Sequence, residues 1–172
     1  SQYGHKKVSI LDGGFKNWKI KKFKIETGEP QNKEPSNYIA KNNPKNIKFF
    51  EDIKNNITNS TFKLIDARPS GRFNATDPEP RPELRSGNIP NSQNLPFSKL
   101  LDPTTGCMKN KDELKKIFDE LKISSEDKIT FSCGSGVAAV IAGTAYEKVF
   151  NKEFDVYDGS WTEWALKNKL IK

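Results

Sequence analysis

The stretch KITFSCGSGVAAVIAGTAYEKVF, residues 128–150, decides the fold of this chain. Its first five residues, KITFS, are predicted to form a buried strand. From 136 to 149, small and apolar residues recur at the spacing of a helix. A cysteine in the glycine-rich turn CGSG (133–136) joins the two segments. A strand, a tight turn and a helix in this order predict one unit of an α/β sheet.

Strand-like and helix-like segments alternate on either side of this stretch. Helices are predicted at 47–57 and 112–121, and strands at 63–66, 93–95 and 154–157. The alternation predicts an α/β fold, a mainly parallel sheet with helices on both faces. Ligands of such sheets bind beyond the carboxyl ends of the strands. We therefore expect a site formed by the loops after Asp66, Ser132 and Tyr157.

The composition limits the possible classes of protein. A chain of 172 residues is long enough for one complete domain. Its longest apolar stretch, around 137–142, is far shorter than the ~20 residues of a membrane span. Two cysteines and one histidine cannot build a Cys/His zinc site by themselves, and they do not suggest a disulfide scaffold. We expect no metal, no cofactor and a reducing compartment, cytoplasmic or mitochondrial.

The net charge of +7 is concentrated near the start of the chain. Residues 1–35 hold eight lysines against four acidic residues. Such an excess attracts nucleic acid or anionic lipid in some proteins. No binding motif of arginines and aromatic residues accompanies these lysines. We interpret the segment as a solvated linker and expect neither a nucleic-acid partner nor a membrane partner.

The chain contains an internal repeat. VSILDGGFKNW (8–18) aligns with FDVYDGSWTEW (154–164), and Asp, Gly and Trp coincide in the two copies. Each copy predicts a short buried strand, a glycine turn and the start of a helix, and Ser160 is a natural N-cap for the second helix. A single strand–turn–helix cannot bury its own apolar face. The repeat therefore predicts two similar domains in the natural protein.

The predicted domain organisation has three parts. Residues 1–20 are interpreted as the end of a first domain, and we expect the natural chain to extend upstream of Ser1. Residues 21–37, rich in charge and carrying Gly and Pro, are interpreted as a linker. Residues 38–172 are interpreted as the complete second domain.

The turn around Cys133 has features of a reactive site. Backbone N–H groups of the turn and of the helix N-terminus are expected to point at one spot and favour negative charge there. A thiol in that position would react as a thiolate. The only histidine, His5, is distant in sequence, which disfavours a Cys–His dyad. Ala139 stands where a phosphatase-like loop needs Arg. The alternative is a buried structural cysteine, and Cys107 is interpreted as incidental.

A second group of candidates follows the strand that ends at Asp66. Arg72 and Arg81 flank a proline-rich excursion and could together bind a small carboxylate through bidentate contacts. Surface pairing with Asp77, Glu79 or Glu83 is the alternative for each arginine. Arg68 is interpreted as structural.

At this point the motifs match a known family. They are LDGGFKNW (11–18), LIDAR (64–68), GRF (71–73), DPEPR (77–81), GNIP (87–90), NLPF (94–97), CGSGVAA (133–139) and YDGSWTEW (157–164). The chain resembles the tandem-rhodanese sulfurtransferases over almost its whole length, and most closely their 3-mercaptopyruvate branch. The resemblance implies two rhodanese domains with the nucleophilic cysteine in the second.

The resemblance also implies roles for individual residues. Cys133 would attack the sulfur of 3-mercaptopyruvate, releasing pyruvate and leaving a persulfide, and Ser135 would assist. The implied substrate-binding residues are Arg72, Arg81, Gly134, Gly136, Val137 and Ala138. The outer sulfur would then pass to cyanide or to a thiol acceptor such as a thioredoxin. The first domain is expected to pack beside the site.

Two alternative functions stay open. One is a thiosulfate sulfurtransferase, and the other is a non-catalytic sulfur-relay or binding module. The family's thiosulfate enzymes tend to carry basic residues after the cysteine, whereas Gly134 and Ser135 follow it here. Ala138 departs from the family's common Thr, which removes one hydroxyl from the expected cradle.

Overall fold

A computed structural model describes residues 3–5, 7–29, 34–35 and 37–168. Its centre is one sheet of five parallel strands in the order β1-β5-β4-β2-β3. The strands are β1 (Ile47–Lys48), β2 (Lys63–Asp66), β3 (Gln93–Asn94), β4 (Ile129–Ser132) and β5 (Asp155–Tyr157). The predicted α/β class with a parallel sheet is confirmed.

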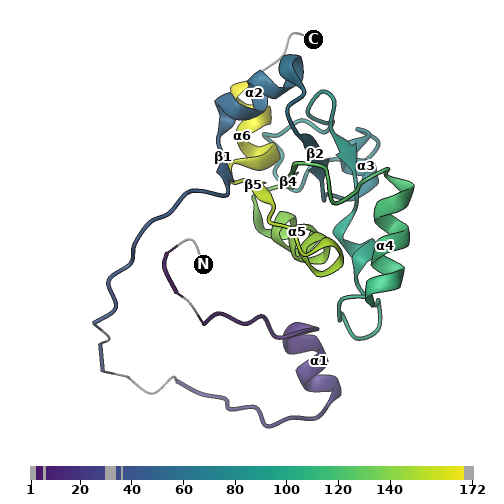
Figure 1. The fold of residues 1–172 in the computed structure, drawn as a ribbon. Helices are drawn as coiled ribbons and strands as arrows, with labels where there is room; N and C mark the ends of the chain where they lie inside the picture. The colour runs from purple at the N-terminus through teal and green to yellow at the C-terminus, as the bar shows by residue number, and fades with distance from the viewer. Residues whose placement is uncertain (1–2, 6, 30–33, 36, 169–172) are drawn as a thin grey trace.

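Helices cover both faces of the sheet (Figure 1). The described helices are α1 (Gly14–Ile20), α2 (Phe50–Asn59), α3 (Ser70–Phe73), α4 (Lys111–Glu120), α5 (Val137–Phe150), α6 (Ser160–Lys167) and the short 3-10 helix η1 (Phe97–Leu100). Helices α4 and α5 pack on one face, and α2 and α6 on the other. No helix among these described residues has the length and apolar character needed to span a membrane.

Two apolar clusters hold the layers together. One cluster joins α4 and α5 to the sheet through the rings of Phe118, Phe131 and Tyr146. The other joins α2 and α6 to the opposite face, with Trp161 and Trp164 buried in it. Burial of a large side chain contributes roughly 1.5–3 kcal/mol, so these clusters fix the carboxyl edge of the sheet, where the loops of interest lie.

The helix predicted at 47–57 is wrong at its beginning. Ile47 lies in β1, paired with Val156 of β5, and α2 begins only at Phe50. Phe49 is extended, and its N–H donates to the side chain of Asp52 at 2.8 Å. That bond satisfies an amide at the N-terminus of α2 and marks where the helix begins. Ile47, the first apolar residue of the periodic pattern, therefore lies before the helix, in the edge strand β1.

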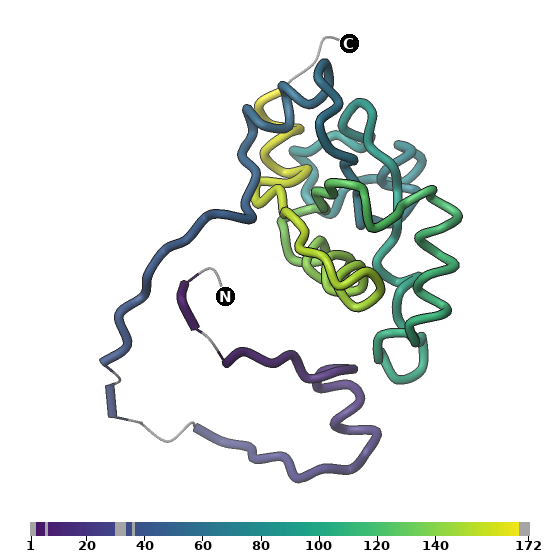
Figure 2. Tube along the Cα trace, in the orientation of Figure 1, coloured from purple at the N-terminus to yellow at the C-terminus, as the bar shows by residue number. Residues whose placement is uncertain are grey.

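The first copy of the repeat folds only in part. Helix α1 forms, but residues 8–11 lie in no strand, and Ile10 is 72% exposed. These residues pair with no described strand, so the predicted buried strand is wrong. The predicted linker, 21–37, includes 30–33 and 36, which lie outside the described residues. Figure 2 shows the described part of residues 21–46 arching away from the sheet before β1.

Candidate active site

Cys133 follows β4 directly, and the N-terminus of α6 binds the carbonyls of its loop. The Trp161 N–H donates to the Cys133 carbonyl at 2.9 Å, and the Thr162 N–H to the Gly134 carbonyl at 3.0 Å. In a trans peptide the C=O and the next N–H point in opposite directions. The amides of Gly134 and Ser135 therefore point away from α6, and neither donates to another described residue.

Ser160 controls the other side of the loop. Its hydroxyl accepts from the amides of Cys133 and Gly136, each at 3.1 Å, and donates to the Tyr157 carbonyl at 2.8 Å. The predicted N-cap role of Ser160 is wrong, because its side chain binds the cysteine loop and not its own helix. Two loop amides are thereby committed to Ser160, which leaves Gly134 and Ser135 to supply the unpaired amides.

A cavity of about 380 Å³ brings most of the predicted residues together. Its lining includes Arg72, Arg81, Cys133, Gly134, Ser135, Val137 and Ala138, with Leu84, Phe97, Ile141 and Thr162 among the rest. Cys133 is only 3% exposed. Gly136 lines a neighbouring cavity instead, where its φ of +81° bends the loop into α5. The roles of these residues in chemistry stay predictions.

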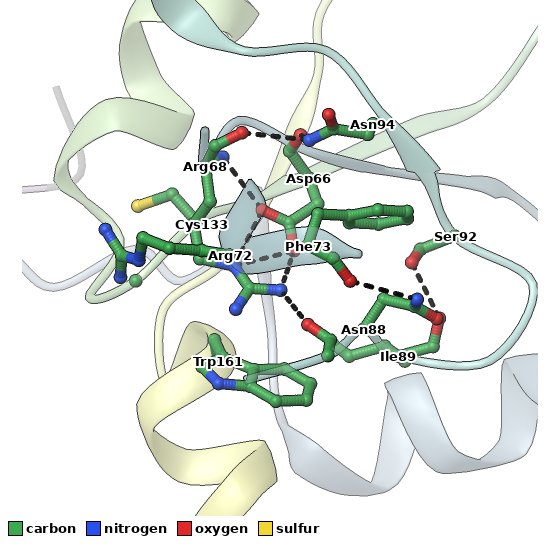
Figure 3. A network of polar contacts seen from close by, with 12 residues as sticks. Asp66, Arg68, Arg72, Phe73, Asn88, Ile89, Ser92, Asn94, Cys133 and Trp161 are labelled. Atoms are coloured by element: carbon green, nitrogen blue, oxygen red, sulfur yellow. Dashed lines mark hydrogen bonds and ion pairs between the residues drawn. The ribbon is translucent and has the colours of Figure 1, made fainter. Parts of the chain in front are cut away.

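A buried carboxylate connects Arg72 to the protein interior. Glu79 accepts from Arg68 Nη1 at 2.8 Å through one oxygen and from Arg72 Nε at 3.0 Å through the other. Arg72 thus pairs with Glu79, but not on the surface as the alternative supposed, because the carboxylate is buried. Arg72 also lines the cavity. Figure 3 shows the Cys133 sulfur and the Arg72 side chain on the same side of the Asp66–Arg68 ion pair.

Arg68 is the structural centre of the network, as predicted. It is 1% exposed and makes a bidentate ion pair with Asp66, at 2.6–3.1 Å. Its guanidinium also lies 4.3 Å from the centre of the Trp161 ring. Arg85 lies over the same ring, and burial together with the nearby Arg68 charge lowers the pKa of Arg85. Buried charges need such pairing.

Comparison with known proteins identifies the fold. A family model described as the rhodanese-like domain matches residues 49–167. The chain belongs to the rhodanese family. It is 38% identical to 3-mercaptopyruvate sulfurtransferase of Mus musculus over 165 residues, and 36% identical to thiosulfate sulfurtransferase of Gallus gallus over 162. These alignments cover 96% and 94% of this chain but 55% of each relative, so the chain spans about half the length of these curated relatives.

Solved structures agree with this assignment. The rhodanese domain matches the crystal structure of Tum1 from Saccharomyces cerevisiae with a TM-score of 0.82 and 33% identity, covering 95% of this chain and 59% of that one. The crystal structure of SseA from Escherichia coli, described as a 3-mercaptopyruvate sulfotransferase, matches with a TM-score of 0.78 and 35% identity, covering 93% of this chain and 58% of that one. A relative from Arabidopsis thaliana, 34% identical, is named as mitochondrial.

Three residues that the rhodanese domain places at the site were not predicted there. Glu79 carried a signal, since it stands between the two candidate arginines, but it was considered only as a surface partner. Ser160 was assigned to a cap. Thr162 follows Tyr157, whose loop was expected at the site, but a polar residue in a helix gave no sign of its partner. Ser160 and Thr162 contact the cysteine loop more than twenty residues away in sequence, whereas Glu79 contacts Arg72 only seven residues away.

The remaining candidates lie elsewhere in the rhodanese chain. His5 stacks on Tyr38, with ring centroids 3.9 Å apart, and does not line the Cys133 cavity. The Cys107 sulfur accepts from Asn17 Nδ2 at 3.2 Å, where α1 meets the loop before α4. Both cysteines are free thiols.

Proposed function

We propose that this chain carries the catalytic domain of a sulfurtransferase that takes sulfur from 3-mercaptopyruvate onto Cys133. The observation that carries the proposal is one cavity lined by Cys133, by two arginines and by two loop residues whose backbone amides donate to no described residue. A small α-keto acid with a terminal thiol needs such a set of partners. Relatives named 3-mercaptopyruvate sulfurtransferase support the same reaction.

The first half of the reaction forms a persulfide. The Cys133 thiolate attacks the substrate sulfur and forms an S–S bond, while the bond between that sulfur and carbon 3 breaks. The electron pair passes to carbon 3, giving the enolate of pyruvate, which takes up a proton. Arg72 and Arg81 stabilise the carboxylate and the developing oxyanion. Ser135 donates a hydrogen bond to the sulfur or relays the proton.

The second half returns the cysteine to its thiolate form. An acceptor thiolate or cyanide attacks the outer sulfur, and the S–S bond breaks with its electron pair remaining on Cys133. The unpaired amides of Gly134 and Ser135 stabilise negative charge on sulfur in both halves. Gly136 allows the sharp bend, while Val137 and Ala138 form an uncharged wall. The acceptor that we propose besides cyanide is a thiol, such as that of a thioredoxin.

Local charge favours a carboxylate ligand at Arg81. Arg68 and Arg72 are balanced by Asp66 and Glu79, all within one network of ion pairs. Arg81 makes no ion pair with a described residue, and its Nη1 donates to the neutral hydroxyl of Thr162. Among the arginines at this cavity, Arg81 is therefore the one whose positive charge lacks a described counter-ion.

Thiosulfate is the second candidate donor. Relatives named thiosulfate sulfurtransferase are 36–37% identical to this chain. Thiosulfate carries two negative charges on a compact ion, and the residues that follow Cys133 are uncharged. This cavity offers a dianion little compensation close to the sulfur, so 3-mercaptopyruvate is the preferred donor.

The test is donor-specific labelling of Cys133. The chain is incubated with 3-mercaptopyruvate or with thiosulfate, and the tryptic peptide containing residue 133 is weighed by mass spectrometry. We expect one added sulfur from 3-mercaptopyruvate, much less from thiosulfate, and none in Cys133→Ser. Cys107→Ser is the matched control and should retain the label. Absence of a persulfide with both donors would favour the binding module.

We also propose the setting in which the domain works. Residues 38–172 form the catalytic unit, and residues 1–20 belong to a first rhodanese unit that packs beside the site. The internal repeat supports this division, as does the docking of α1 next to a cavity that shares Ser135 with the site. Two free cysteines fit a reducing compartment, the cytoplasm or the mitochondrion.

A further inference from the structure

Thr162 connects the exposed arginine of the cavity to the cysteine loop. Its hydroxyl accepts from Arg81 Nη1 at 2.9 Å and donates to the Gly134 carbonyl at 2.7 Å. Its backbone N–H donates to the same carbonyl at 3.0 Å. A hydroxyl has one proton to donate, and here that proton is committed to the loop, so the direction of the two side-chain bonds is defined.

This chain of bonds has two consequences for the cavity. The Arg81 guanidinium, at the end of a flexible side chain, is held by one neutral partner, the Thr162 hydroxyl. Arg81 has no ion pair among the described residues. The Gly134 carbonyl is held toward α6 by two donors, which keeps the Ser135 amide pointing the other way. Linked hydrogen bonds also polarise one another. The position of the arginine and the orientation of the loop peptide are therefore coupled through a single hydroxyl.

We propose that Thr162 is a positioning residue that sets the preference of the Cys133 cavity for carboxylate-bearing reactants. It does so by holding Arg81 where it meets the ligand carboxylate while the reacting group faces Cys133. The inference deepens the proposed function, since it assumes that Cys133 is the reacting group. It does not require that the reactant deliver sulfur.

A pair of alkylating agents tests the proposal without any sulfur donor. Iodoacetate and iodoacetamide both transfer a substituted methylene to the Cys133 thiolate, and iodide leaves with the bonding electrons. They are similar in size, but only iodoacetate carries a carboxylate. The ratio of their rates at Cys133, followed by mass spectrometry with Cys107→Ser as background, measures carboxylate recognition and cancels general changes in thiol reactivity.

We expect Thr162→Val to lower the iodoacetate-to-iodoacetamide ratio about five- to tenfold, as for loss of a typical intramolecular hydrogen bond. Valine has nearly the shape of threonine but no hydroxyl. Thr162→Ser retains the hydroxyl and should keep the wild-type ratio, as should Thr104→Val, a matched substitution in an exposed turn. An equal slowing with both reagents, or an unchanged ratio, would overturn the proposal.

A double-mutant cycle guards against a variant that merely folds poorly. If Thr162 acts through Arg81, Thr162→Val should not change the ratio further in an Arg81→Ala background. A further fall there would overturn the proposal. Persulfide labelling of the wild-type protein distinguishes failure of this proposal from failure of the proposed function. If the wild type forms the persulfide but Thr162→Val leaves the ratio unchanged, only the role of Thr162 is refuted. If Thr162→Val changes the ratio but the wild type forms no persulfide, only the sulfur-transfer reaction is refuted.

Discussion

At the scale of single residues, Ser160 shows how a buried hydroxyl can organise a reactive loop. It has a φ of +49°, and its oxygen joins the end of β5 to two amides of the cysteine turn. A residue in the left-handed region costs free energy unless its surroundings require it. Here the three hydrogen bonds to Cys133, Gly136 and Tyr157 hold Ser160 in this conformation.

Removal of this hydroxyl should destabilise the fold and slow alkylation of Cys133. We expect Ser160→Ala to lower the free energy of unfolding by about 2–4 kcal/mol, since it leaves buried polar groups unpaired. Ser160→Gly should be milder by about 1 kcal/mol, because glycine tolerates positive φ. Urea unfolding and the rate of iodoacetamide labelling measure both effects. Equal stability of wild type and Ser160→Ala would contradict this role.

The buried phenol of Tyr157 should make the free energy of unfolding depend on alkaline pH. Burial, followed by its hydrogen bond to Glu163 at 2.9 Å, raises the pKa of the phenol. The folded state therefore keeps the proton above pH ~10, where an unfolded tyrosine loses it. This contribution to stability is complete below pH ~10 and is lost as the pH rises further.

Replacement of Tyr157 by Phe removes that titration. Above pH ~10, we expect the free energy of unfolding of the variant to fall less steeply than that of wild type, by about 1.4 kcal/mol per pH unit. Unfolding in urea from pH 8 to 11 measures both slopes. At neutral pH both side chains are uncharged, so a constant offset there reports only the lost hydrogen bond. Parallel slopes above pH 10 would refute the assignment.

At the scale of secondary structure, the close packing of α5 requires a glycine. A Cβ on Gly143 would lie 2.1 Å from the ring of Phe154, which packs against Phe131 before β5. Glycine in a helix interior costs about 1 kcal/mol of helix propensity relative to alanine. Glycine is nevertheless present at position 143, because the Phe154 ring occupies the space that a side chain would need.

Gly143→Ala should therefore destabilise the protein although it favours the helix. We expect a net loss of about 1–2 kcal/mol, since overpacking of a core costs roughly 1–3 kcal/mol against the gain in propensity. Glu147→Ala, at an exposed position of the same helix, is the control and should change stability by less than about 0.5 kcal/mol. Thermal unfolding of both variants checks the comparison, and a stabilised Gly143→Ala would show that the Phe154 ring moves freely.

Secondary structure was largely predictable where burial is periodic. The strand at 63–66 was predicted with its correct bounds, and the other central elements to within one residue or so, because alternation and helical spacing record which side chains face the sheet. Ile47 was misassigned because an edge strand of two residues is too short to have a period of its own.

At the scale of the whole molecule, the N-terminal segment docks on the rhodanese domain through a few polar contacts. Asp12 Oδ1 accepts from the Met108 N–H at 2.8 Å, and Lys16 Nζ donates to the Pro103 carbonyl at 2.7 Å. Apolar residues of this segment stay exposed, including Ile10 and Phe15. The docking is thus set by hydrogen bonds at the surface and not by a shared apolar core.

Asp12→Ala should loosen this docking without unfolding the domain. We expect faster amide hydrogen exchange at Met108 and faster proteolysis within residues 8–29, because the contact with Asp12 is lost. The free energy of unfolding of the domain should change by less than about 0.5 kcal/mol. Lys54→Ala, at an exposed position of α2, serves as a surface control. Unchanged exchange at Met108 would argue that Asp12 does not hold the segment.

The α/β alternation, the position of Cys133 after a buried strand and the candidate arginines were predictable from the sequence, because each depends on local pattern and residue type. The alternation also predicted that the loops after Ser132 and Tyr157 lie at one edge of the sheet. The fold was needed to show that Glu79 is shared by Arg68 and Arg72, and that Ser160 and Thr162 hold the cysteine loop. Because β5 pairs with β4, the start of α6 contacts a loop more than twenty residues earlier in the chain, and no local pattern records which side chains meet there.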